Sequence, residues 1–179
     1  MTMRNVALLV VGLLLLLLQS NLYLILGPLG LHGATPSLLL PLVVYLGVHE
    51  PSMARGASLA FALGYLQDLL ASAPIMLFAF VMVAVWWLAR VVGVRLTAQT
   101  VLTRMSLAFA FTLVESAIVL ILLAIFGSDN RRPLEMVSLM LPHAVATAVV
   151  SSPVFRLAQR LHQSAAPTRP GADLGAAQR

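Results

Sequence analysis

Long apolar runs, separated by short polar or proline-containing segments, fill most of this chain. A helix that crosses a bilayer needs about 20 mostly apolar residues, and shorter helices are tolerated within a packed bundle. The runs therefore predict six membrane-spanning helices, at 5–26, 36–49, 54–71, 74–93, 105–127 and 134–153. Proline favours the first turn of a helix and breaks its interior, and it marks these boundaries at Pro28, Pro36, Pro51, Pro74 and Pro133.

The composition supports a membrane protein. The chain is 60% hydrophobic and 9% charged, whereas soluble domains are about 45–50% apolar and about 25% charged. We expect an all-α polytopic membrane protein with one six-helix transmembrane domain over residues 1–162. The remainder, 163–179, is rich in Ala, Pro, Gly and polar residues, a composition typical of a disordered tail.

The arginines predict the orientation of the helices. With the N-terminus in the cytoplasm, nine of the 11 basic residues fall in inner segments, and only Arg131 and Arg132 fall in an outer one. This bias follows the positive-inside rule and places both termini in the cytoplasm of a bacterial inner-membrane protein. Because the basic residues are sparse and lie between apolar runs, the net charge of +5 indicates topology and not nucleic-acid binding.

The third predicted span carries a stripe of small residues that ends in a carboxylate. Gly56, Ala60, Gly64 and Asp68 follow at steps of four and so share one helix face, where small residues let another helix approach closely. A charged group deep in a membrane costs about 2.5–3.5 kcal/mol, so Asp68 needs a reason to be there. One interpretation is functional: Asp68 binds a partner or joins a polar network. The other is structural: its carboxylate is solvated by headgroup water, or it bonds the backbone amides that start the next helix, near 73–75. In each case it should face protein.

Two further polar residues lie within predicted spans. Glu115 is near the middle of the fifth span, and His143, beside Pro142 in the sixth, is its candidate partner. Together with Asp68 they form either a proton-coupled site or neutral, hydrogen-bonded contacts that hold helices together. The chain has no cysteine, and no nucleotide-binding, hydrolase or zinc-protease motif is present. We therefore expect no enzyme activity, no metal and no cofactor.

Two segments resemble a known family. Residues 36–46 begin with a proline that opens the second span, and residues 64–70 read Gly-Tyr-Leu-Gln-Asp-Leu-Leu. Both resemble the rod shape-determining protein MreD family, whose third span ends in a Gly-x-x-x-Asp-Leu-like motif that Gly64 and Asp68 match. Glu115 resembles an acidic position of some members. The chain departs from the family at Ser37, where members often carry Asp, and over 71–76, where their usual glycines are missing.

The resemblance implies a non-enzymatic inner-membrane scaffold of the cell-elongation machinery. Such proteins bind an MreC-like bitopic membrane protein and act with an MreB-like actin, a RodA-like glycosyltransferase and its transpeptidase in lateral peptidoglycan synthesis. Their six-helix bundle is similar to the S components of vitamin transporters. The alternative function is accordingly a small-molecule, vitamin-type binding subunit, with Asp68, Glu115 and His143 lining a cavity.

Overall fold

The computed structural model describes residues 2–26, 35–71, 76–93, 101–126 and 133–164, and these segments are helical almost throughout. They contain no strand, so the all-α prediction is confirmed for this part of the chain. The helices are α1 (Thr2–Leu26), α2 (Leu39–His49), α3 (Met53–Leu70), α4 (Leu77–Gly93), α5 (Val101–Phe126) and α6 (Pro133–Ser164).

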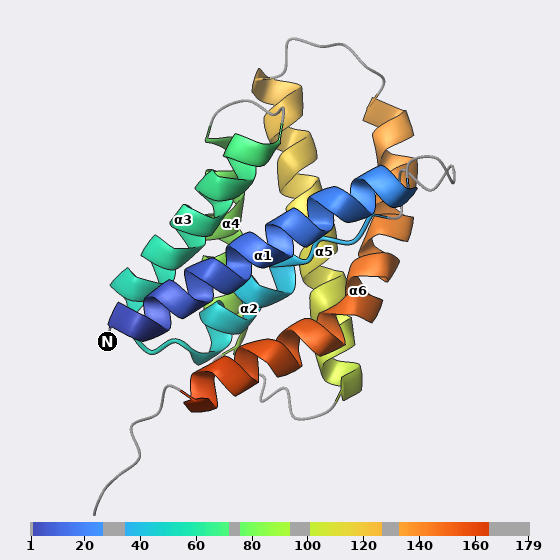
Figure 1. The fold of residues 1–179 in the computed structure, drawn as a ribbon. Coiled ribbons are helices and arrows are strands. Elements are labelled where there is room, and N and C mark those ends of the chain that lie inside the picture. Colours follow the sequence, from blue (N-terminus) through green and yellow to red (C-terminus); the bar gives the residue numbers. More distant parts are fainter. Residues whose placement is uncertain (1, 27–34, 72–75, 94–100, 127–132, 165–179) are drawn as a thin grey trace, which may run out of the picture.

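The short helix α2 forms the centre of the bundle. In Figure 1, α1 crosses the front, α3 and α4 form one side, and α5 and α6 form the other. Helix α2 contacts all five other helices, and every residue from Leu39 to Gly47 is buried. A helix that is apolar on all sides avoids water either in a protein core or in lipid, and the Leu- and Val-rich helix α2 is buried by its neighbours in the bundle.

Helix lengths bear directly on the six-span prediction. Helix α2 has 11 residues, a length of about 16 Å, whereas the hydrocarbon core of a bilayer is about 30 Å thick. Among the described residues, the segments Asn5–Leu22 of α1 and Leu102–Ile125 of α5 are long and apolar enough to cross a membrane. Helices α2 and α4 are apolar but shorter. Six complete spans thus stay a prediction.

Helix α6 is longer than the sequence analysis predicts. It continues through Pro153 to Ser164 and contains Pro142 as well, and Figure 1 shows it changing direction between its orange and red parts. Proline removes a helical hydrogen bond and bends a helix. Here Val154, Phe155 and Ala158 continue the buried face beyond Pro153, so the helix bends and does not stop.

The predicted boundary at 162 therefore falls inside α6, and residues 163 and 164, which the sequence assigned to a disordered tail, are helical. The rest of that predicted tail lies outside the described residues.

Candidate functional site

The small-residue stripe of α3 packs against α4. Gly56, Ala60, Gly64 and Asp68 are all buried. A Cβ atom on Gly56 would lie 2.6 Å from the indole nitrogen of Trp86, and one on Gly64 would lie 2.6 Å from the carbonyl oxygen of Phe78. Either position would therefore resist a larger side chain, because the neighbouring helix already occupies the space.

The carboxylate of Asp68 caps the first turn of α4. The backbone amide of Phe78 donates to Oδ1 at 2.8 Å, and that of Ala79 donates to Oδ2 at 3.0 Å. The first amides of a helix have no partner within the helix and attract negative charge. The residue before the helix, Met76, has an apolar side chain and a φ of 72° and cannot supply a polar cap. Asp68 supplies it from the preceding helix.

One contact thus explains the four-residue spacing of Gly64 and Asp68. Gly64 lets the first turn of α4 come close, and Asp68, one turn further along α3, binds the amides that this approach presents. These amides belong to Phe78 and Ala79 in the first turn of α4, which begins at Leu77. The predicted amides near 73–75 lie outside the described residues. Asp68 is only 9% exposed, so it faces protein, and both of its oxygens accept bonds within the chain.

A second polar region surrounds the start of α2 inside the bundle. The amide of Ser37 donates to Oγ1 of Thr147 on α6 at 2.9 Å, and the amide of Leu38 donates to Oε1 of Gln19 on α1 at 3.0 Å. Backbone amides buried in an apolar bundle require such partners. The sequence analysis missed Gln19 and Thr147, although a polar residue inside an apolar run was the available signal.

Glu115 and His143 are not joined by any hydrogen bond that the structure shows. Nδ1 of His143 instead bonds the carbonyl of Thr35, just before α2. Glu115 is 5% exposed, and its Oε2 has no hydrogen-bond partner among the described residues. The three predicted polar residues consequently have separate surroundings: Asp68 caps α4, His143 holds the entry to α2, and Glu115 is a buried carboxyl group without a shown partner.

A third cluster joins α2, α3 and α4 at the lower end of the bundle. Glu50, the first residue after α2, pairs with Arg55 at 3.3 Å, and its side chain is 2% exposed. The guanidinium of Arg90 donates to the carbonyl oxygens of Glu50 at 2.7 Å and Pro51 at 2.9 Å, and it lies 5.8 Å from the centre of the Trp86 ring. Arg90, predicted only as a topology residue, therefore also fixes the turn between α2 and α3.

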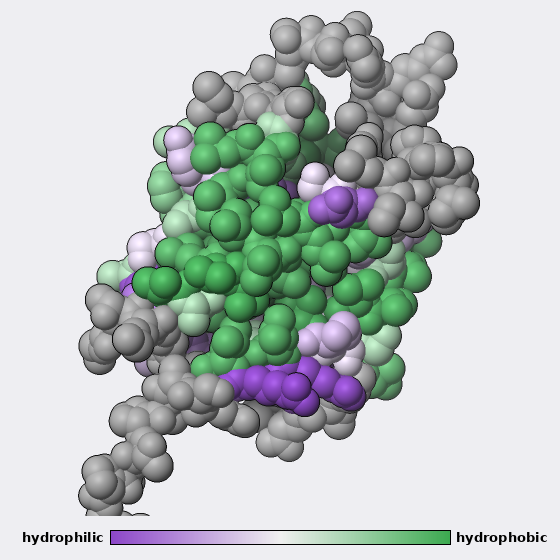
Figure 2. Space-filling model, in the orientation of Figure 1, coloured by the Kyte–Doolittle hydropathy of each residue, from purple (hydrophilic) through white to green (hydrophobic). Residues whose placement is uncertain are grey.

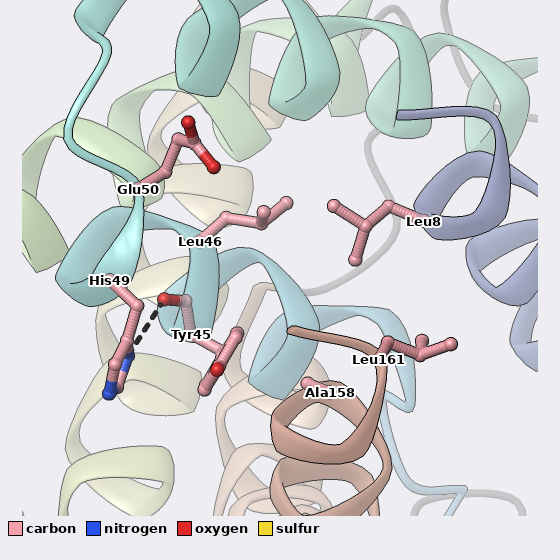
Figure 3. Close-up of a pocket in the computed structure, with 7 residues that line it drawn as sticks. All are labelled: Leu8, Tyr45, Leu46, His49, Glu50, Ala158 and Leu161. Carbon is pink, nitrogen blue, oxygen red and sulfur yellow. Dashed lines mark hydrogen bonds between the residues drawn. The ribbon is translucent and has the colours of Figure 1, made fainter. Parts of the chain in front are cut away.

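A small hollow lies beside this cluster. Its walls come from α1, α2 and α6, and Figure 3 shows Leu46 and Leu8 facing each other across it, with the Tyr45–His49 pair to one side. The free space is about 10 Å³, which is room for about one water molecule. The lining residues are Leu8, Tyr45, Leu46, His49, Glu50, Ala158 and Leu161. A space of this size cannot hold a vitamin-sized ligand.

Among the described residues no group of three or more His, Asp or Glu side chains could hold a metal ion. His32 lies outside those residues, and His49 stacks on Tyr45 with ring centroids 4.2 Å apart. Comparison with known protein families, with curated proteins and with solved structures finds no match for this chain.

Proposed function

We propose that this chain is a non-enzymatic scaffold in a bacterial cytoplasmic membrane, similar to MreD, that takes part in cell elongation. The observation that carries the proposal is the joint role of Gly64 and Asp68. The two residues that match the family motif act together in one buried contact, in which α3 caps and positions α4. A motif with a specific structural task is better support for a resemblance than shared apolar composition.

Membrane insertion is supported by the surface as well as by length. Figure 2 shows an apolar face over the middle of the bundle, with hydrophilic groups gathered towards its ends. Large apolar side chains are exposed on α1, α3, α4, α5 and α6, among them Leu14, Leu69, Phe80, Ile121 and Val149. Water would make such a surface costly, whereas lipid accepts it. We propose a multi-pass arrangement with both termini in the cytoplasm.

The proposed partners are those of the MreD-like role. We propose a bitopic, MreC-like protein as the direct partner. Through it the scaffold would work with an MreB-like actin, a RodA-like glycosyltransferase and its transpeptidase in lateral peptidoglycan synthesis. The scaffold role requires helix faces and not a catalytic centre, and α3 and α4 form a closely packed pair whose outer faces expose large apolar residues.

Depletion of the chain in its host, with imaging and a membrane pull-down, tests this function. We expect rod-shaped cells to become round and an MreC-like protein to be recovered with the tagged chain. Asp68→Ala should disturb cell shape more than Asp129→Ala, which removes the same charge from the predicted outer loop. Cells that stay rod-shaped but lose vitamin uptake would contradict the scaffold role.

The alternative, a small-molecule binding subunit, has one observation in its favour. Glu115 is a buried carboxyl group with an oxygen that no described residue bonds. A ligand with a donor group would satisfy it. The two functions predict different effects of Glu115→Gln: the scaffold should tolerate this change, whereas the carrier should lose uptake.

A further inference from the structure

The part of α6 after Pro153 has two different faces. Val154, Phe155 and Ala158 are buried against the bundle. Arg156 and Arg160, four residues apart and therefore on one face, are exposed. In Figure 2 a hydrophilic band follows the lower edge of the molecule, where Figure 1 places the red end of α6. We name residues 154–164 the α6 arm.

The surroundings of the arm are basic. Arg104, in the first turn of α5, donates to Oε1 of Gln159 on the arm at 3.2 Å, so a third guanidinium is fixed beside it. Neither the arm nor residues 101–108 of α5 contain an acidic residue. At the same end of the bundle, the carboxylate of Glu50 is buried and paired with Arg55. The positive charge of the arm is therefore not balanced by these neighbours.

We propose that the α6 arm binds the phosphate headgroups of anionic phospholipids at the inner surface of the membrane, through Arg156 and Arg160. Arg104, held beside the arm by its hydrogen bond to Gln159, adds to the positive electrostatic potential there. Arginine suits this role because its planar guanidinium bonds phosphate oxygens in pairs. The inference rests on the proposed membrane location but not on the cell-elongation role.

The exposed face favours a lipid surface over an acidic protein. Leu157, 40% exposed, lies between the two arginines in sequence. An apolar side chain beside basic ones is typical of helices that lie in the membrane interface, where the apolar group enters the acyl region and the guanidinium groups reach the headgroups. The change of direction between the orange and red parts of α6 turns the arm away from the upper part of the helix (Figure 1).

The test uses the full chain purified in mild detergent and mixed with nanodiscs or vesicles of phosphatidylcholine, with or without phosphatidylglycerol as the anionic lipid. Retained lipids are measured by native mass spectrometry. A basic residue at an anionic surface contributes about fivefold to binding, so Arg156→Gln with Arg160→Gln should reduce the preference for phosphatidylglycerol about 30-fold at low salt. The preference of the unmodified chain should fall with added salt.

The matched control is Arg131→Gln with Arg132→Gln, which removes the same charge from the predicted outer loop. It should reduce the preference much less, because Asp129 and Glu135 lie within three residues of this pair in the sequence and offset its charge. Arg156→Lys with Arg160→Lys keeps the positive charge and should retain most of the preference for phosphatidylglycerol. This variant therefore distinguishes an effect of lost charge from an effect of lost folding. An equal loss in the arm variant and the control would overturn the proposal, as would a chain with no preference for anionic lipid. Retention of an acidic protein by the arm in place of lipid would also overturn it. If depletion leaves cell shape unchanged but the lipid measurements come out as expected, the cell-elongation role is refuted and the lipid-binding proposal is not.

Discussion

Replacing Asp68 by alanine should destabilise the protein by loosening the start of α4. The change removes the acceptor for two buried backbone amides, those of Phe78 and Ala79, at 2.8 and 3.0 Å. Loss of a helix cap costs about 0.5–2 kcal/mol, and hydrogen bonds to a charged group contribute about 1.5–3 kcal/mol each. We expect a loss of about 3 kcal/mol for Asp68→Ala. Asp68→Asn keeps one acceptor oxygen and should cost about half as much.

Unfolding in mixed micelles, followed by far-ultraviolet circular dichroism as denaturing detergent is added, measures this loss. Hydrogen exchange should locate it, because the amides of Phe78 and Ala79 lose protection while those of α5 keep theirs. Asp129→Ala serves as the control and should change stability by less than about 0.5 kcal/mol.

Gly64→Ala tests whether the motif acts as one unit. The new Cβ would lie 2.6 Å from the carbonyl oxygen of Phe78 and push the start of α4 away, at a cost of about 1–3 kcal/mol. In that background Asp68→Ala should cost less than it does alone, because the cap is already displaced. Strictly additive effects, or a loss below about 0.5 kcal/mol for Asp68→Ala, would refute the capping explanation.

Four other changes test the remaining contacts. Met76→Gly should stabilise the protein by about 1 kcal/mol, seen as a higher unfolding midpoint, because glycine accepts a φ of 72° without strain. Arg90→Gln should make the α2–α3 turn more sensitive to limited proteolysis, whereas an unchanged cleavage pattern would contradict its role in holding the two carbonyls. Thr147→Val should cost about 1–3 kcal/mol in the same micelle assay, since it leaves a buried amide unpaired. Glu115→Gln should leave stability and cell shape unchanged, because Oε2 has no partner to lose among the described residues; lost uptake with normal folding would instead favour the carrier function.

The sequence by itself determined most of the helices and one important face. Apolar runs and boundary prolines placed all six helices to within a few residues at most ends, because apolar length and proline are local properties. The spacing from Gly56 to Asp68 defined a buried face of α3 for the same reason, since the helical repeat alone puts these residues in line.

Only the tertiary structure decided what each face meets. The partner of Asp68 is the amide pair at the start of α4, and that start depends on how closely Gly64 lets the helices approach. The path of α6 past Pro153 depends on side chains that bury against distant helices. Likewise, the apolar run of α2 does not say by itself whether it contacts lipid or protein, and the tertiary structure buries it at the centre of the bundle. Local pattern fixes the helices, and the contacts between them settle the rest.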